Sequence, residues 1–157
     1  MSNFLKLVIS ISIPLAIGAT SGFFTVTGAE SWYQGINKPS WNPPNRIFGP
    51  VWTTLYIMMG ISFFLIWKAD TSRETKKMAM VFFTAQLVLN FFWSFIFFNQ
   101  QQPGWALVEL AALWLMILAT IFAFGNISKT AAWLLAPYIS WVSFASILNY
   151  TIWQMNR

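Results

Sequence analysis

Five apolar blocks, each long enough to cross a bilayer, constrain the fold of this chain more than any other feature. They run approximately over residues 7–27, 47–67, 78–98, 105–124 and 130–153. A helix needs about 20 apolar residues to span a hydrocarbon core of about 30 Å. The blocks lack the apolar–polar alternation of barrel strands and are about twice as long as such strands. The sequence therefore predicts an all-α membrane protein, in which a single domain over residues 1–157 forms a bundle of five transmembrane helices.

The charge content supports this prediction. Only 8% of the residues are charged and 57% are hydrophobic, whereas about a quarter of the residues of a soluble domain are charged. The net charge is +5, but the chain has no soluble module with a basic face, which nucleic-acid binding would require. The positive charge therefore indicates contact with anionic lipid headgroups.

The first block also has features of a signal peptide, because Lys6 precedes an apolar run that reaches the small residues Gly18, Ala19 and Ser21. The apolar run continues to Val26, beyond any plausible cleavage site. We therefore expect this block to be retained as a membrane helix. Within it, Gly18 and Gly22 form a small-xxx-small pattern, which indicates close helix packing within the molecule more than a dimer contact.

The basic residues predict an orientation in the membrane. If the N-terminus shares a side with the second and fourth connections, that side carries six of the nine basic residues, namely Lys6, Lys68, Arg73, Lys76, Lys77 and Lys129. The opposite side carries Lys38, Arg46 and Arg157. The positive-inside rule then predicts a cytoplasmic N-terminus in a bacterial inner membrane. An outer membrane remains the alternative location.

The chain contains neither cysteine nor histidine. The absence of histidine removes the commonest general base, the usual metal ligand and the usual axial ligand of haem. The absence of cysteine removes thiolate nucleophiles and iron–sulfur ligation. We therefore expect no metal site and no required cofactor.

Aromatic residues are abundant instead, with ten Trp, sixteen Phe and four Tyr. Interfacial belts explain the tryptophans at or near block ends, which are Trp67, Trp105, Trp133 and Trp153. They explain less well the tryptophans that lie deeper, which are Trp93, Trp114 and Trp141. We expect these deeper indoles either to pack within the bundle or to contact a ligand.

Several side chains are placed to face the interior of the bundle. In the third block a helical stripe contains Gln86, Asn90, Trp93, Ser94 and Phe97, and in the fifth a similar stripe contains Trp141, Ala145, Leu148 and Asn149. Trp52 and Tyr56 lie one turn apart in the second. Buried amides must find partners, so Asn90 and Asn149 face the bundle, either as interhelical hydrogen bonds or as part of a site.

Glu109 is the only acidic residue within an apolar block. An ionisable residue inside a membrane span is a candidate functional group by default. The alternative is structural, because a carboxylate near the N-terminus of the fourth helix is tolerated by the helix dipole and by nearby water. The sequence leaves both interpretations open.

The connection between the first two blocks is aromatic and rich in proline. It continues into the second block as WYQGINKPSWNPPNRIFGPVWTTLY over residues 32–56. Such a stiff, amphipathic connection predicts a structured lid over one end of the bundle, with Trp32, Lys38, Trp41 and Arg46 as its principal residues. The prolines before the second block favour the start of a helix there.

Four segments resemble the tryptophan-rich sensory protein or translocator protein family, also called TspO/MBR. They are KPSWNPPNRIFGPVWTTLY from Lys38, QLVLNFFWSFIFF from Gln86, GWALVEL from Gly104 and PYISWVSFASILNYTIW from Pro137. The resemblance covers essentially the whole chain, in order. It implies a five-helix bundle, often a homodimer, that binds porphyrins, sterols and benzodiazepine-type ligands in a pocket beneath the first loop.

The resemblance also implies a set of ligand-binding residues, which are Phe48, Trp52, Asn90, Trp93, Trp105, Trp141, Ala145 and Leu148. To these we add Tyr56, which lies one turn from Trp52, and Glu109, which is a candidate because it is the only acid within a span. A porphyrin is flat and apolar, and indole faces bind such a surface at little cost in rotamer entropy. Its propionates need donors, for which we expect Lys38, Arg46 and the N-terminus of the second helix.

The sterol motif found at the C-terminus of some relatives is broken here. Leu148 and Tyr150 are present, but six residues separate Tyr150 from Arg157, the next basic residue. Three function classes remain. The chain is a porphyrin-binding sensor or regulator, a light-dependent porphyrin-degrading enzyme, or a transporter of porphyrins or small lipophiles. For the enzyme, the resemblance implies Trp52 and Trp141 as the reactive indoles.

Overall fold

The computed structural model describes all 157 residues, and it confirms the five membrane-length helices. Four of its elements are long helices that span the bundle, namely α1 (Asn3–Gly22), α3 (Asn45–Lys68), α4 (Arg73–Ser94) and α5 (Pro103–Gly125). The fifth span consists of the short α6 (Lys129–Leu134) and α7 (Ala136–Asn156). A one-turn helix, α2 (Trp32–Gly35), lies in the first connection, and a π-helix, η1 (Phe95–Asn99), continues α4.

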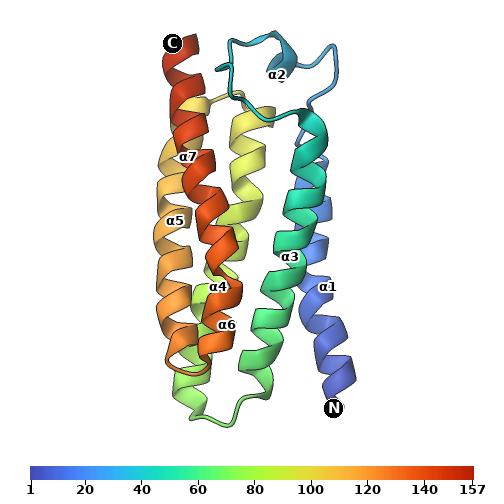
Figure 1. Cartoon of the computed structure of the whole chain (residues 1–157), viewed down its shortest axis with the longest axis vertical. Coiled ribbons are helices and arrows are strands. Elements are labelled where there is room, and N and C mark those ends of the chain that lie inside the picture. Colours follow the sequence, from blue (N-terminus) through green and yellow to red (C-terminus); the bar gives the residue numbers. More distant parts are fainter.

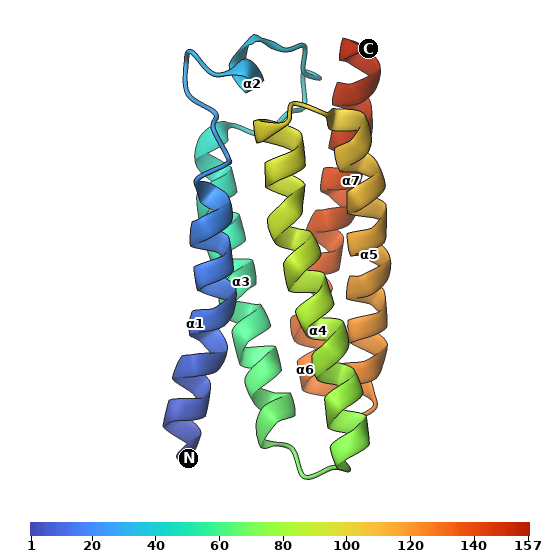
Figure 2. The ribbon, with the colours of Figure 1, turned by 180° about the vertical axis from the view of Figure 1, so that it is seen from behind.

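The helices form a closed ring (Figures 1 and 2). Going around it, α1 packs on α3, α3 on α6, the α6–α7 span on α5, α5 on α4, and α4 on α1. The N-terminus lies at one end of the bundle, while α2 and the C-terminus lie at the other. The second and fourth connections therefore share the end of the N-terminus, as the orientation argument requires.

Serine side chains begin four of the helices. The hydroxyl groups of Ser2, Ser31, Ser72 and Ser128 accept the backbone N–H three residues ahead, which satisfies a donor that the first turn leaves free. As a result α1 begins at residue 3 and α4 at residue 73, before the apolar blocks that start at 7 and 78. Hydropathy marks only the apolar part of a span and misses its polar first turn.

Two spans differ from the predicted blocks in other ways. α1 stops at Gly22 and not at 27, and Phe23, Phe24 and Thr25 continue in tight turns whose N–H groups bond three residues back. The fifth span is interrupted at Leu135, because Pro137 has no N–H group to donate to the carbonyl four residues back, at Trp133. The cap hydrogen bonds that end α6 point back to Ala132 and Trp133.

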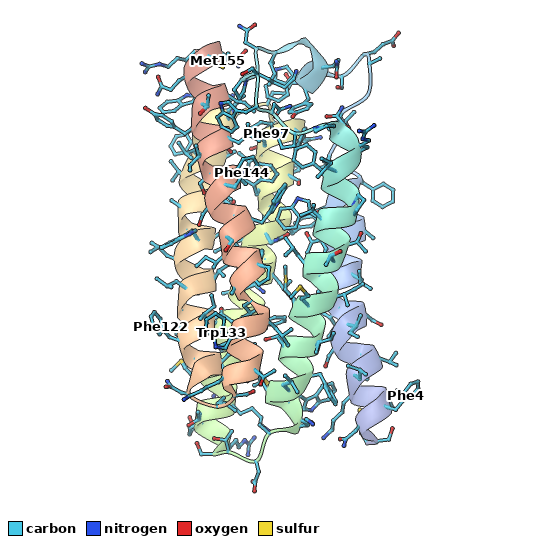
Figure 3. The ribbon with its side chains drawn as sticks, viewed as in Figure 1. Phe4, Phe97, Phe122, Trp133, Phe144 and Met155 are labelled. Atoms are coloured by element: carbon cyan, nitrogen blue, oxygen red, sulfur yellow. The ribbon has the colours of Figure 1, made fainter.

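The interior consists of two apolar clusters. The larger fills the half of the bundle near the N-terminus, and the smaller joins Tyr33, Phe97, Ala106, Leu148 and Ile152 at the end near α2. Figure 3 shows the labelled Phe97 lying between the helices at that end, while Phe4 and Phe122 point away from the bundle. Such exposed rings have the bilayer as their apolar surroundings.

Candidate ligand-binding site

A cavity of about 500 Å³ lies in the half of the bundle near α2. Every spanning helix contributes to its lining, as do α2 and η1, and 17 of the 27 lining residues are hydrophobic. Cavities of 300–1,000 Å³ with apolar walls and a few polar groups are typical of small-molecule sites. The interior between the helices is therefore large enough to hold a ligand.

Aromatic rings from three helices face this cavity. On α3, the Trp52 and Tyr56 rings stack with centroids 5.6 Å apart. Phe48, one turn earlier, meets the ring of Trp141 on α7 edge-on at 6.1 Å. On α4, the ring of Trp93 stacks with that of Phe97 at 5.2 Å. The site thus offers ring faces and edges, which suit a flat apolar ligand.

A chain of buried hydrogen bonds crosses the bundle beside the cavity. The Tyr56 hydroxyl donates to Oδ1 of Asn90 at 2.6 Å, and Nδ2 of Asn90 donates to the Tyr138 hydroxyl at 2.8 Å. The Tyr138 hydroxyl in turn donates to Oε1 of Gln86 at 2.7 Å. Asn90 therefore joins α3, α4 and α7, and it also lines the cavity. Asn90 therefore both forms interhelical hydrogen bonds and belongs to the candidate site.

Asn149 has a similar double role on α7. Its Oδ1 accepts from Nε1 of Trp93 at 3.0 Å, and its Nδ2 donates to the carbonyl of Pro103 at 2.8 Å. These bonds tie α7 to α4 and to the start of α5. They also fix the plane of the Trp93 indole at the cavity wall.

Most of the predicted ligand-binding residues line the cavity, namely Phe48, Trp52, Tyr56, Asn90, Trp93, Trp141, Ala145 and Leu148. Trp105 does not, because α5 buries Ala106, and the neighbouring position is turned about 100° away. Trp105 is 68% exposed on the outer face of α5, which agrees with its alternative assignment to an interfacial belt.

Glu109 also lies outside the cavity. It sits on α5 next to the buried Leu110, and both oxygens of its carboxyl group are buried without a hydrogen-bond partner. A buried polar group without a partner costs stability. The structure therefore separates Glu109 from the cavity lining and leaves its carboxyl group uncompensated.

Glu109→Leu is expected to raise the free energy of unfolding by about 1 kcal/mol, because it replaces an unpartnered buried group with an apolar one. Protoporphyrin affinity, if the chain binds this probe, is expected to stay unchanged. Thermal unfolding in detergent measures the first effect. Glu30→Leu, at an exposed loop position, is the control and is expected to change stability by less than about 0.5 kcal/mol. A lower melting temperature for Glu109→Leu than for the control would contradict this explanation.

None of the four residues predicted to form the lid lines the cavity, and three of them, Trp32, Lys38 and Trp41, lie in the first connection. Trp32 meets Phe97 edge-on at 5.7 Å, and Trp41 meets Phe144 edge-on at 5.9 Å. Arg46 is exposed in the first turn of α3. The two indoles thus rest on rings that do line the cavity.

Lys38 stabilises the loop from within. Its Nζ donates to the carbonyls of Tyr33, Gln34 and Ile36 at 2.7, 3.3 and 3.2 Å, and it lies 4.8 Å from the centre of the Tyr33 ring. These carbonyls belong to the end of α2, where a cation is favourable. The ammonium group is therefore already engaged by the loop and does not point freely to a ligand.

Tyr33 is the α2 residue that lines the cavity, and the sequence interpretation missed it. It is 4% exposed, and its hydroxyl donates to Oδ1 of Asn42 at 3.2 Å. Burial raises the pKa of Tyr33 above its ordinary value, an effect that the hydrogen bond to Asn42 partly offsets. The hydroxyl therefore remains a neutral donor at physiological pH. The available signal was the Ser31 cap, which begins a helical turn and directs Tyr33 inward.

Comparison with known proteins identifies the family of this chain. The sequence matches the model of the TspO/MBR family over residues 10–154. The chain belongs to the TspO/MBR family. It is 43% identical to tryptophan-rich protein TspO of Chlorobaculum tepidum over 97% of this chain and 96% of that protein. It is 44% identical to tryptophan-rich protein TspO of Archaeoglobus fulgidus over 98% and 99% of the two chains. Human translocator protein is 44% identical over 80% of this chain and 75% of its own length.

In this TspO/MBR family member the first loop is fastened to the end of α7. The backbone N–H of Asn37 donates to Oδ1 of Asn156 at 2.8 Å, and Nδ2 of Asn156 donates to the carbonyl of Asn37 at 2.7 Å. Nδ2 of Asn37 also donates to the carbonyl of Met155 at 3.3 Å. We refer to these three hydrogen bonds as the Asn37–Asn156 clasp.

Asn156→Ala is expected to increase the rate of hydrogen exchange in loop residues 36–42, because two bonds of the clasp are lost and the loop opens more often. Loss of these bonds lowers the free energy of local opening by about 1 kcal/mol or more, which raises the rate of local exchange about fivefold or more. Mass-spectrometric hydrogen exchange measures this change. Gln154→Ala, two residues away and without a hydrogen bond from its side chain, is the control. Equal exchange in both variants would show that the clasp does not hold the loop.

Proposed function

We propose that this TspO/MBR family member is a membrane sensor or regulator that binds a flat tetrapyrrole of the protoporphyrin type in its cavity. The observation that carries the proposal is the aromatic lining, in which Phe48, Trp52, Trp93 and Trp141 face one cavity from three helices. Indole and phenyl rings provide a large contact area with few rotatable bonds. In the proposal the loop that carries α2 acts as the lid.

The proposed mode of binding is through the faces of the macrocycle. The chain has no histidine to coordinate iron, so binding through the ring faces favours a metal-free porphyrin. The propionates then lie toward the end of the cavity near α2, within the positive field of the α3 N-terminus and of Arg46. Lys38 contributes indirectly, by holding the loop in shape.

The membrane orientation is part of the same proposal. Six of the nine basic residues belong to the end that carries the N-terminus, so this end is assigned to the cytoplasm of a bacterial inner membrane and the lid to the opposite side. We also expect a homodimer, in line with the resemblance. Gly18 does not serve that contact, because a Cβ atom there would collide with the ring of Tyr56 in the same chain.

Parallel titrations with protoporphyrin, haem and cholesterol test the proposal, with quenching of tryptophan fluorescence as the readout for the two tetrapyrroles. Cholesterol is tested as a competitor of protoporphyrin. We expect saturable quenching by protoporphyrin, weaker affinity for haem, and no competition by cholesterol, since the C-terminal sterol motif is broken. Equal affinity for all three compounds, or no saturable binding of protoporphyrin, would refute the tetrapyrrole assignment.

Light-dependent degradation of the porphyrin is the second candidate function. The observation in its favour is that Trp52 and Trp141 line the same cavity, with Trp52 stacked on Tyr56. Illumination of bound protoporphyrin separates this function from simple binding. Loss of the absorbance change in Trp52→Phe and Trp141→Phe supports an enzyme, whereas bleaching that survives both substitutions refutes the role of these indoles. A transporter, the third class, would instead move protoporphyrin across proteoliposomes in the dark.

A further inference from the structure

A second, smaller hollow of about 260 Å³ lies beside the cavity. It is bounded by the turn that follows α1, by α2 and by the end of η1. Two of the residues that line it, Tyr33 and Phe98, also line the main cavity. These two rings therefore form the partition between the hollow and the cavity.

The partition consists of side chains without hydrogen bonds across it. The Tyr33 and Phe98 rings lie 5.4 Å apart, and Trp32 and Tyr33 meet Phe97 through ring contacts alone. No hydrogen bond joins α2 to η1. On the opposite side the Asn37–Asn156 clasp fastens the same loop to α7 with three hydrogen bonds. The α2 part of the loop is thus held by directional bonds at α7 and by movable rings at η1, whereas the turn that follows α1 is fastened to the end of α4 by a hydrogen bond of 3.1 Å from Oγ1 of Thr25 to Oγ of Ser94.

The rim of the hollow has the character of a membrane interface. Phe23 and Val26 are 82% and 56% exposed, and both are apolar. The polar side chains of Ser31, Asn99 and Gln101 complete the rim. An exposed apolar group beside neutral polar groups is suited to the boundary between lipid tails and headgroups. The hollow therefore opens where an amphiphilic ligand would partition.

The π-helix η1 explains why Phe98 stands at the partition. Its N–H groups bond five residues back, as in the bond from Gln100 to the carbonyl of Phe95. This wider turn allows two consecutive rings, Phe97 and Phe98, to line the main cavity. Single π-turns within α-helices occur frequently at functional sites.

We infer that the hollow is an outer subsite and the entrance of the cavity for flat, lipophilic ligands with polar substituents. The ligand moves from the bilayer interface into the hollow and then into the cavity when the Phe98 and Tyr33 rings rotate. The loop stays clasped to α7 during this movement. The inference rests on the proposed function, since it concerns the route to the same cavity.

The absence of native cysteine allows a test by selective blocking. Asn99→Cys, at the exposed rim, is labelled with a bulky maleimide, and protoporphyrin binding is followed by stopped-flow quenching of tryptophan fluorescence. We expect association and dissociation to slow by the same factor, about tenfold or more, with the Kd unchanged, because the label obstructs the route and not the cavity. Ser40→Cys with the same label is the matched control, because Ser40 is exposed and lies next to Trp41, whose ring meets Phe144 of α7. This label is expected to leave both rates unchanged.

Unchanged rates for labelled Asn99→Cys, or slowing by the Ser40→Cys label alone, would overturn the inference and place the route under the α7 side of the loop. Phe98→Leu provides an independent measurement without a label. It removes part of the partition and is expected to speed association severalfold, about three- to tenfold, and unchanged association would count against the inference. Failure of the unmodified protein to bind protoporphyrin at equilibrium would instead refute the proposed function, so the two failures are distinguishable.

Discussion

Gly60→Ala is expected to lower the free energy of unfolding by about 1–3 kcal/mol, through overpacking of two helix backbones. A Cβ atom at Gly60 would lie 2.5 Å from Cα of Ile11 and 2.8 Å from the backbone oxygen of Ser10. Both atoms belong to the backbone of α1 and have no rotamer through which to move away. The substitution therefore forces α1 and α3 apart along the contact that closes one side of the cavity.

Gly49→Ala is the matched control for this prediction, since it lies on the same helix. Apart from its chain neighbours and the nearby backbone of its own helix, no atom lies within 4 Å of a Cβ atom at Gly49. Alanine favours a helix over glycine by about 1 kcal/mol, so this variant is expected to be at least as stable as the parent. Thermal unfolding of the three proteins in one detergent gives the comparison. Equal melting temperatures for the two variants would show that α1 and α3 do not depend on close approach at Gly60.

Asn90→Leu is the second substitution with a large expected effect. It removes the acceptor of the Tyr56 hydroxyl and the donor to the Tyr138 hydroxyl at the same time. Two buried polar groups then lose a partner, at a cost of about 2 kcal/mol or more. We expect a correspondingly lower free energy of unfolding, measured by denaturant titration in mixed micelles.

A double-mutant cycle with Tyr56→Phe isolates the bond between the two side chains. Once Tyr56 has no hydroxyl group, part of the penalty for losing Asn90 disappears. The double variant is therefore expected to be more stable than the sum of the single effects by about 1 kcal/mol. Strict additivity would mean that the 2.6 Å contact between these groups contributes nothing to stability.

The number of spans and much of the candidate site follow from the sequence for a physical reason. A span must be apolar over the thickness of the bilayer, and this property is readable from composition alone. Within a span the helical period fixes which residues share a face, so Asn90, Trp93 and Phe97 were placed together correctly. On α7 the same argument placed Ala145 and Leu148 on the cavity side.

Features that depend on contacts distant in sequence did not follow. The inward direction of Tyr33 depends on how a 22-residue connection, residues 23–44, folds back over the bundle. The engagement of the Lys38 ammonium by loop carbonyls depends on the same fold. Trp105 was misplaced because the boundary of the α5 buried face lies one residue away, at Ala106. The π-turn at η1 has no hydropathy signature, since all the residues concerned are apolar apart from Asn99.

Protoporphyrin affinity of Ala145→Phe tests most directly whether the ligand occupies the cavity between Trp52 and Trp141. Ala145 lines the cavity from α7, so a phenyl ring at this position takes up ligand space. We predict an affinity loss of about a hundredfold, equivalent to about 2.7 kcal/mol, while Ala111→Phe on the exposed face of α5 binds as the parent does. Parent-like affinity in a folded Ala145→Phe protein would contradict the account, because the ligand would then have to bind elsewhere.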